Sequence, residues 1–255
     1  MKSWLLVAVL LAGASDQPAQ SVVVRHPEGL VRGFLTLKTL DGRLLADGDL
    51  VQNVSGDRVS TRLTFHFKDG SLQDETAVYS QRGRFRLISD RLIQKGPAFP
   101  RPIDMTIDGA NGRVTVRYSD DGKPKVAAEE LKLPPDLANG LLSNLLKNIR
   151  AAAPPASVGF VAATPKPRLV KLDISVAGQD NFTTGGVSHK ATHYVLKVNI
   201  GGIQGWLAPL VGKQPPDSHV WILEGEAPAF VKAEQPFYLG GPLWRIELAS
   251  PAWPK

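Results

Sequence analysis

The chain has 255 residues, of which 43% are hydrophobic and 21% charged, and its net charge is +6. This balance is typical of a globular protein with a sizeable core, and it excludes an intrinsically disordered chain. The sequence has no cysteine, which excludes disulfides, thiolate catalysis, thiolate metal ligands and a lipoprotein anchored through a cysteine. The positive charge is spread along the chain and forms no basic block, so we expect no nucleic-acid partner.

Residues 1–20 have the pattern of a secretory signal peptide. Lys2 supplies the positive start, Trp4–Leu11 the apolar run, and Ala12–Ala14 a cleavage site of small residues. We therefore expect an exported bacterial protein, periplasmic or secreted, that is soluble and is not a lipoprotein. The apolar run is too short to span a bilayer, and no later stretch reaches that length, so we expect no transmembrane anchor.

The first half of the mature chain is punctuated by Asx-Gly pairs that separate segments of alternating polarity. These pairs readily adopt the positive φ angles of tight hairpin turns, and they predict a series of antiparallel hairpins. The four pairs are Asp41-Gly42, Asp69-Gly70, Asn111-Gly112 and Asp121-Gly122.

The segments between turns alternate with a period of two. In residues 61–68, for example, Leu63, Phe65 and Phe67 share one face. An antiparallel sheet that packs on one side requires this pattern. Similar segments predict about a dozen strands, and the chain is therefore expected to be mainly β, with a large curved antiparallel sheet, either half-barrel or sandwich-like.

One segment, at about 136–150, changes to a helical period. Its apolar residues recur at 3.6-residue spacing, and Asp136 is a natural N-cap. The apolar stripe predicts an amphipathic helix packed on the concave face of the sheet. The Ala/Pro-rich residues 151–156 that follow are the one candidate boundary. We expect a single β-rich domain over 21–255, and a division near 151–156 is the alternative.

No motif predicts catalysis. His189 and His193 are spaced like metal ligands, but on a strand they lie roughly 13 Å apart and cannot share an ion. The glycines at 201–205 match no phosphate-binding loop. The carboxylates of Asp74-Glu75 and of Glu129-Glu130 point to opposite faces of a strand. We predict no catalytic residue, metal or cofactor, and a hydrolase whose site is assembled from distant residues is the less favoured alternative.

The last third of the chain is rich in large aromatic side chains, which can line a ligand cavity. Together with the leucine stripe of the expected helix, they are the candidate ligand-binding residues. These candidates are Leu141, Leu145, Trp206, Trp221, Phe230 and Tyr238.

The stretch 220–232 (VWILEGEAPAFVK) is similar in arrangement to a family of uncharacterised exported bacterial β-rich proteins. The layout of signal peptide, hairpin-rich sheet and single covering helix also resembles the half-barrel periplasmic carriers typified by the outer-membrane lipoprotein chaperones. That resemblance implies a concave apolar face that accepts acyl chains.

These observations suggest a non-enzymatic cell-envelope protein that binds a lipid or another apolar or amphipathic ligand between sheet and helix. The alternative is a structural or interaction module that binds an envelope protein or a glycan.

Overall fold

The computed structural model describes residues 22–184, 187–199 and 215–249. Fourteen strands and one helix occur in these ranges. They are β1 (Val31–Thr39), β2 (Leu44–Ser55), β3 (Arg58–Phe67), β4 (Leu72–Ser80), β5 (Arg86–Lys95), β6 (Ile103–Asp108), β7 (Arg113–Asp120), β8 (Lys123–Glu130), α1 (Leu142–Asn148), β9 (Ala156–Ala162), β10 (Arg168–Thr184), β11 (Val187–Asn199), β12 (Ser218–Leu223), β13 (Ala229–Pro236) and β14 (Leu243–Leu248).

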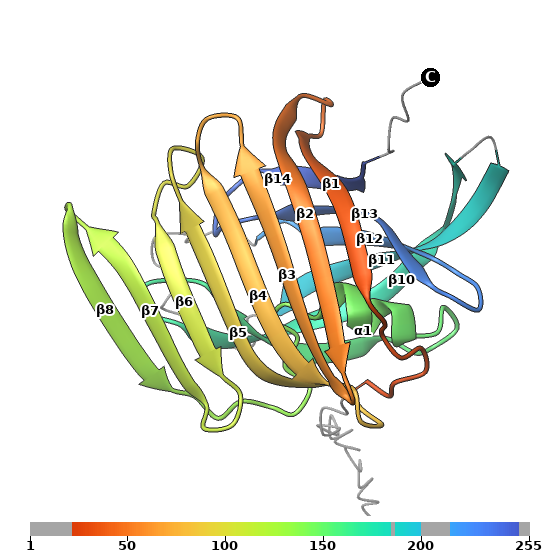
Figure 1. Cartoon of the computed structure of the whole chain (residues 1–255), viewed down its shortest axis with the longest axis horizontal. Helices are drawn as coiled ribbons and strands as arrows, with labels where there is room; N and C mark the ends of the chain where they lie inside the picture. The colour runs from red at the N-terminus through yellow and green to blue at the C-terminus, as the bar shows by residue number, and fades with distance from the viewer. Residues whose placement is uncertain (1–21, 185–186, 200–214, 250–255) are drawn as a thin grey trace, which may run out of the picture.

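All strands belong to one antiparallel sheet that does not close. Its order is β8-β7-β6-β5-β4-β3-β2-β1-β14-β13-β12-β11-β10-β9, so two meanders meet where β1 pairs with β14. The sheet bends so that β1–β8 face β9–β14, and α1 lies between the two halves (Figure 1). The expected mainly β fold with a large curved antiparallel sheet and one helix is confirmed.

Each of the four Asx-Gly pairs turns a hairpin, as predicted. The glycines have positive φ angles: 94° at Gly42, 85° at Gly70, 76° at Gly112 and 74° at Gly122. At the β7–β8 turn Asp121 also has a positive φ, of 48°. Two consecutive positive φ angles match the right-handed twist of the flanking strands, so local sequence determines where these strands reverse.

The alternation of polarity also corresponds to the two faces of the sheet. On β3, Phe65 and Phe67 are buried against the core, whereas Arg62 and His66 on the same strand and Lys68 directly after it are exposed. Because one face is apolar and packs inward, a shift of register by one residue would expose the whole set. The core therefore lies inside the bend of the sheet.

The expected helix is present but shorter than 136–150. It spans Leu142–Asn148, the N-cap position is Leu141, and no side chain caps it, so the prediction of Asp136 as N-cap is wrong. The preceding residues run beside β9 instead, where Leu137 forms a parallel bridge with Gly159. Gly140, with φ of 63°, then turns the chain into the helix.

No helix in the described part of the chain has both the length and the apolar character needed to cross a membrane.

Candidate functional site

The space between α1 and the sheet is filled by the helix's own leucines. Leu141 and Leu145 are 1% and 2% exposed and belong to the main core cluster together with Leu146. Two of the sequence-predicted ligand residues therefore pack the protein's core. Neither of the two grooves described below includes them among its lining residues.

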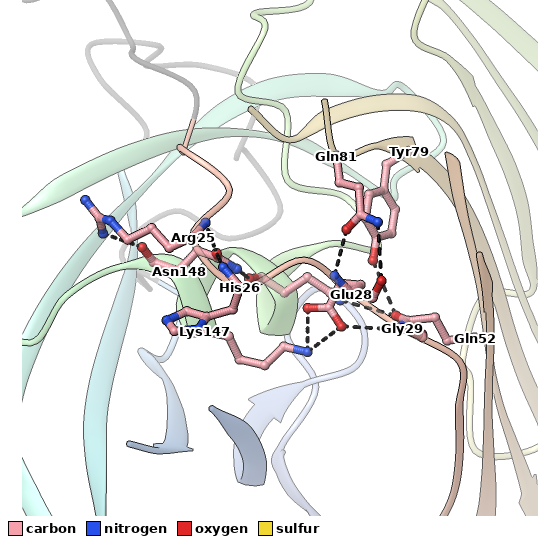
Figure 2. Close-up of polar contacts among 10 residues, drawn as sticks. Arg25, His26, Glu28, Gly29, Gln52, Tyr79, Gln81, Lys147 and Asn148 are labelled. Carbon is pink, nitrogen blue, oxygen red and sulfur yellow. Dashed lines mark hydrogen bonds and ion pairs between the residues drawn. The ribbon is translucent and has the colours of Figure 1, made fainter. Parts of the chain in front are cut away.

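Polar side chains join α1 to the N-terminal segment, residues 25–29, at the end of the sheet where the helix lies (Figure 2). The ammonium of Lys147 lies 2.6 Å from a carboxylate oxygen of Glu28. The other oxygen of Glu28 accepts a hydrogen bond from the Gln52 amide at 3.0 Å. Gln52 in turn accepts hydrogen bonds from Tyr79 and Asn144, each at 3.3 Å. The buried carboxylate is thus neutralised and hydrogen-bonded.

The backbone of the N-terminal segment is held in the same way. The side-chain oxygen of Asn148 accepts hydrogen bonds from the N–H groups of Arg25 and His26, at 2.7 and 2.8 Å. Gln81 accepts the N–H of Glu28 at 2.7 Å. Every contact in this network satisfies a buried polar group, which is a structural role. The network closes the end of the bent sheet where α1 lies.

Two carboxyl groups from neighbouring strands, Glu75 and Asp90, lie near each other on the inner face. Asp74 points outward and forms a bidentate pair with Arg62, whereas Glu75 points inward, as the alternation predicts. Across the β4–β5 pairing Glu75 lies opposite Leu92, and Asp90, two residues before Leu92 on the same face and 1% exposed, is its diagonal neighbour. Among the described residues, neither oxygen of Asp90 has a hydrogen-bond partner.

Burial makes ionisation of this pair costly. It raises the pKa of Glu75 to about 7, and burial followed by the charge of Glu75 raises the pKa of Asp90 well above its usual value. The cross-strand neighbours of both carboxyls are apolar: Leu63 and Leu92 flank Glu75, and Ala77 and Ile107 flank Asp90.

A groove of about 780 Å³ opens at the other end of the strands, where the β1–β2 and β3–β4 hairpins turn. Its volume lies in the range of small-molecule sites. It is lined by Thr39, Leu40, Asp41, Arg43, Leu44, Leu45, Phe67, Lys68, Asp69, Ala98, Pro242, Leu243 and Trp244. The lining is thus mainly apolar.

Aromatic rings form the floor of this groove. Phe67 and Trp244, whose ring centroids lie 5.5 Å apart, line it directly. Phe99 packs against Phe67 at 5.4 Å and against Tyr238 at 6.1 Å. Tyr238, one of the predicted ligand residues, therefore supports the floor, and Trp244 connects it to Phe237 in the core at 5.2 Å.

Four charged residues surround the groove, and they differ in their partners. Asp41 accepts a hydrogen bond from the Thr39 hydroxyl, and this bond lowers the pKa of Asp41. Asp69 accepts the N–H of Ser71 at 2.9 Å. Both carboxylates thus accept hydrogen bonds from within their own turns.

The two cations of the rim are Arg43 and Lys68, both exposed. Within the described ranges, neither forms an ion pair with a carboxylate. An anionic group placed at the rim would therefore meet two cations that form no ion pair, although the charge of Arg43 also acts on the Asp41 carboxylate.

A second groove, of about 190 Å³, lies beside Arg86, Leu87, Gly109 and residues 133–137. This volume is below that of small-molecule sites.

Trp221 lies on the opposite face of the sheet from the core cluster. Its indole N–H donates to Asp180 at 2.6 Å, and its ring stacks on His193 at 4.2 Å. The ammonium of Lys232 lies 4.0 Å from the ring centroid. His193 Nε2 lies 2.9 Å from His219 Nδ1. Burial first, and then the charge of His219, lowers the pKa of His193, so the neutral imidazole is favoured.

The partner of His193 is therefore on a neighbouring strand, while His189 packs against Phe182. No group of three or more potential metal ligands occurs in the described ranges.

Of the other predicted ligand residues, Phe230 packs partly buried against the core and Trp206 lies outside the described residues. The structure thus brings together Leu141 and Leu145, and it places Tyr238 and Trp221 elsewhere.

No protein-family model matches this sequence. No curated protein matches it either. Among solved structures, the chain is similar to a beta-barrel-like protein of domain of unknown function DUF1849 from Brucella abortus. The two are 11% identical, the match covers 91% of this chain and 98% of that one, and the TM-score is 0.47. A likeness at this level carries no argument about function.

Proposed function

We propose that this chain is an exported, non-enzymatic cell-envelope protein that binds an amphipathic ligand with an acyl chain. The observation that carries the proposal is the groove of about 780 Å³ over the aromatic floor of Phe67 and Trp244. Apolar clefts of this size with a few polar groups at the mouth are characteristic of ligand sites.

The groove supports the proposal better than the space beneath the helix does. Leu141 and Leu145 already fill that space, and displacing such side chains costs the free energy of a packed core. In the groove, by contrast, Leu40 is 43% exposed, and an acyl chain would remove its surface from water.

The rim favours an anionic head group. Arg43 and Lys68 lie at the mouth and form no ion pair among the described residues, although Arg43 acts on Asp41 through its charge. Asp41 and Asp69 are hydrogen-bonded within their turns. A carboxylate or phosphate head would pair with the two cations while its chain covers the apolar lining.

Export rests on residues 1–20, whose composition is that of a signal peptide. Cell fractionation and amino-terminal sequencing of the recovered protein test it. We expect the protein outside the cytoplasm, beginning close after Ala14. An uncleaved chain in the cytoplasm would contradict export.

Ligand binding is tested with a fluorescent fatty acid. Leu40→Asp introduces a charge into the groove and is expected to weaken binding about tenfold, because burial of a leucine side chain contributes about 1.5–3 kcal/mol. Leu30→Asp is the matched control, since Leu30 is 73% exposed and does not line the groove. The proposal fails if the probe does not bind or if the two variants behave alike.

The preferred head group is tested with Arg43→Gln/Lys68→Gln. This double variant is expected to lose affinity for the fatty-acid probe and to keep its affinity for the corresponding acyl alcohol. Arg58→Gln/Arg150→Gln removes the same charge from two exposed positions outside the groove lining. Equal losses in both double variants would show that only net charge matters.

A further inference from the structure

The open sheet has two edge strands, and the chain covers one of them. Along β9, the N–H of Ala138 donates to the carbonyl of Gly159 at 2.8 Å. The side chain of Asn139 accepts the N–H of Val161 at 2.8 Å and donates to its carbonyl at 3.0 Å. At Gly159 and Val161 the β9 edge is thus covered from within the chain.

The β8 edge is different, since β8 pairs only with β7 in the described structure (Figure 1). The N–H of Leu131, directly after β8, donates to Gly112 at 2.9 Å on the β7 side. Backbone groups alternate in direction along a strand. The backbone groups of Val126, Ala128 and Glu130 therefore point away from β7.

The side chains along β8 are arranged with opposite charges at its two ends. Lys123 and Lys125 lie in the first half of the strand, and Glu129 and Glu130 lie at its end. Lys125 forms an ion pair with Asp120 in its own hairpin, but the two side chains are 48% and 53% exposed, and such exposed ion pairs contribute little. Between the lysines and the glutamates, Val126 is 65% exposed. When two copies of β8 run antiparallel, the lysines of each strand therefore lie near the glutamates of the other.

We propose that the β8 edge is an interaction surface for a second copy of this chain, with the two β8 strands paired antiparallel about Ala127. This register sets Lys125 opposite Glu129 of the second copy and Val126 opposite Ala128. Val126 and Ala128 both donate and accept across the pair, and opposite charges face each other, which stabilises cross-strand pairing. A parallel pair would place like charges side by side.

Lysine and proline on an edge strand also discourage unspecific pairing. The β8 edge has both properties: it can pair with a second β8 strand, and it discourages pairing with other strands. Pro124 has no N–H to offer and the lysines repel a basic strand, so the edge is selective. A strand with acidic residues at the opposite end, as a second β8 has, meets these lysines with the correct sign.

Sedimentation velocity over roughly 10 to 500 μM tests the proposal, since small interfaces are weak. The wild type is expected to shift from monomer to dimer. Val126→Pro removes an outward N–H without removing a bond to β7 and is expected to stay monomeric. Val126→Thr keeps that N–H and is the control.

Charge variants keep the test independent of folding. Glu129→Lys leaves the Lys125–Asp120 ion pair in place and is expected to weaken the dimer at least tenfold, and adding Lys125→Glu is expected to restore it, because the pairs between the two copies are then reversed in sign. A wild type that stays monomeric over the whole range overturns the proposal. A dimer that persists in Val126→Pro, or one that the double variant fails to restore, also overturns it.

Discussion

Asp90 of β5 lies beside Glu75 of β4 on the inner face of the sheet, and the charge of Glu75 adds to burial in raising the pKa of Asp90. Gly140, just before α1, packs directly over Asp90: a Cβ at that position would lie 3.0 Å from an Asp90 carboxylate oxygen. Asp90 thus lies beneath the segment that leads into the helix, and neither it nor Glu75 has a cation among its cross-strand neighbours.

Stability is predicted to fall as the pH rises towards 7. The folded protein holds the proton of Glu75 up to a pKa of about 7, whereas the unfolded chain releases it near 4.5. The folded state therefore binds more protons in this window, and the free energy of unfolding decreases between pH 4.5 and 7 by on the order of 2 kcal/mol. The raised pKa of Asp90 acts in the same direction.

Urea unfolding of the wild type and of Glu75→Gln across this window measures the effect. The variant mimics the protonated acid, so its stability is expected to depend less on pH and to exceed that of the wild type at pH 8. Comparison of the two cancels other groups, such as His193, whose lowered pKa acts in the opposite direction. Parallel pH profiles would contradict the assignment.

Gly140→Ala is predicted to be strongly destabilising. The added Cβ would lie 2.4 Å from the Cβ of Ala77, at a residue whose φ is 63°. We expect a loss of about 3 kcal/mol from steric overlap and backbone strain together. Gly56→Ala is the control, since Gly56 has φ of 61° and no atom within 4 Å of a Cβ; it is expected to lose only about 1 kcal/mol. Equal losses would mean that Gly140 does not pack against Ala77.

Lys147→Met is predicted to destabilise the closed end of the sheet by about 3 kcal/mol, because it leaves the buried carboxylate of Glu28 without its cation. Glu28→Gln/Lys147→Met removes both charges and is expected to recover a large part of that loss. Chemical denaturation of the two single variants and the double variant gives the coupling energy. A double variant as unstable as the two single losses combined would show that the pair does not interact.

The hairpins could be predicted from the sequence because the information is local. Asp121-Gly122, for example, contains in two residues the backbone conformation that its turn requires. The inward position of Glu75 also follows from alternation along a single strand.

The meeting of Glu75 with Asp90 could not be predicted, because it depends on the register between β4 and β5. The same holds for His193, whose partner His219 lies on the neighbouring strand. The helix start was misplaced for a related reason: the residues from Asp136 to Asn139 bind to β9, and one segment's periodicity does not reveal that competition.

The most direct test of the proposed function is to map where a ligand binds. A photoactivatable fatty acid would be crosslinked to the protein and the labelled peptides identified by mass spectrometry. The proposal predicts labels on the groove lining, in residues 39–45, 67–69 and 242–244, and their loss when unlabelled fatty acid competes. Labels confined to residues 137–149 around the helix, or labels that competition does not reduce, would contradict a binding site in the groove.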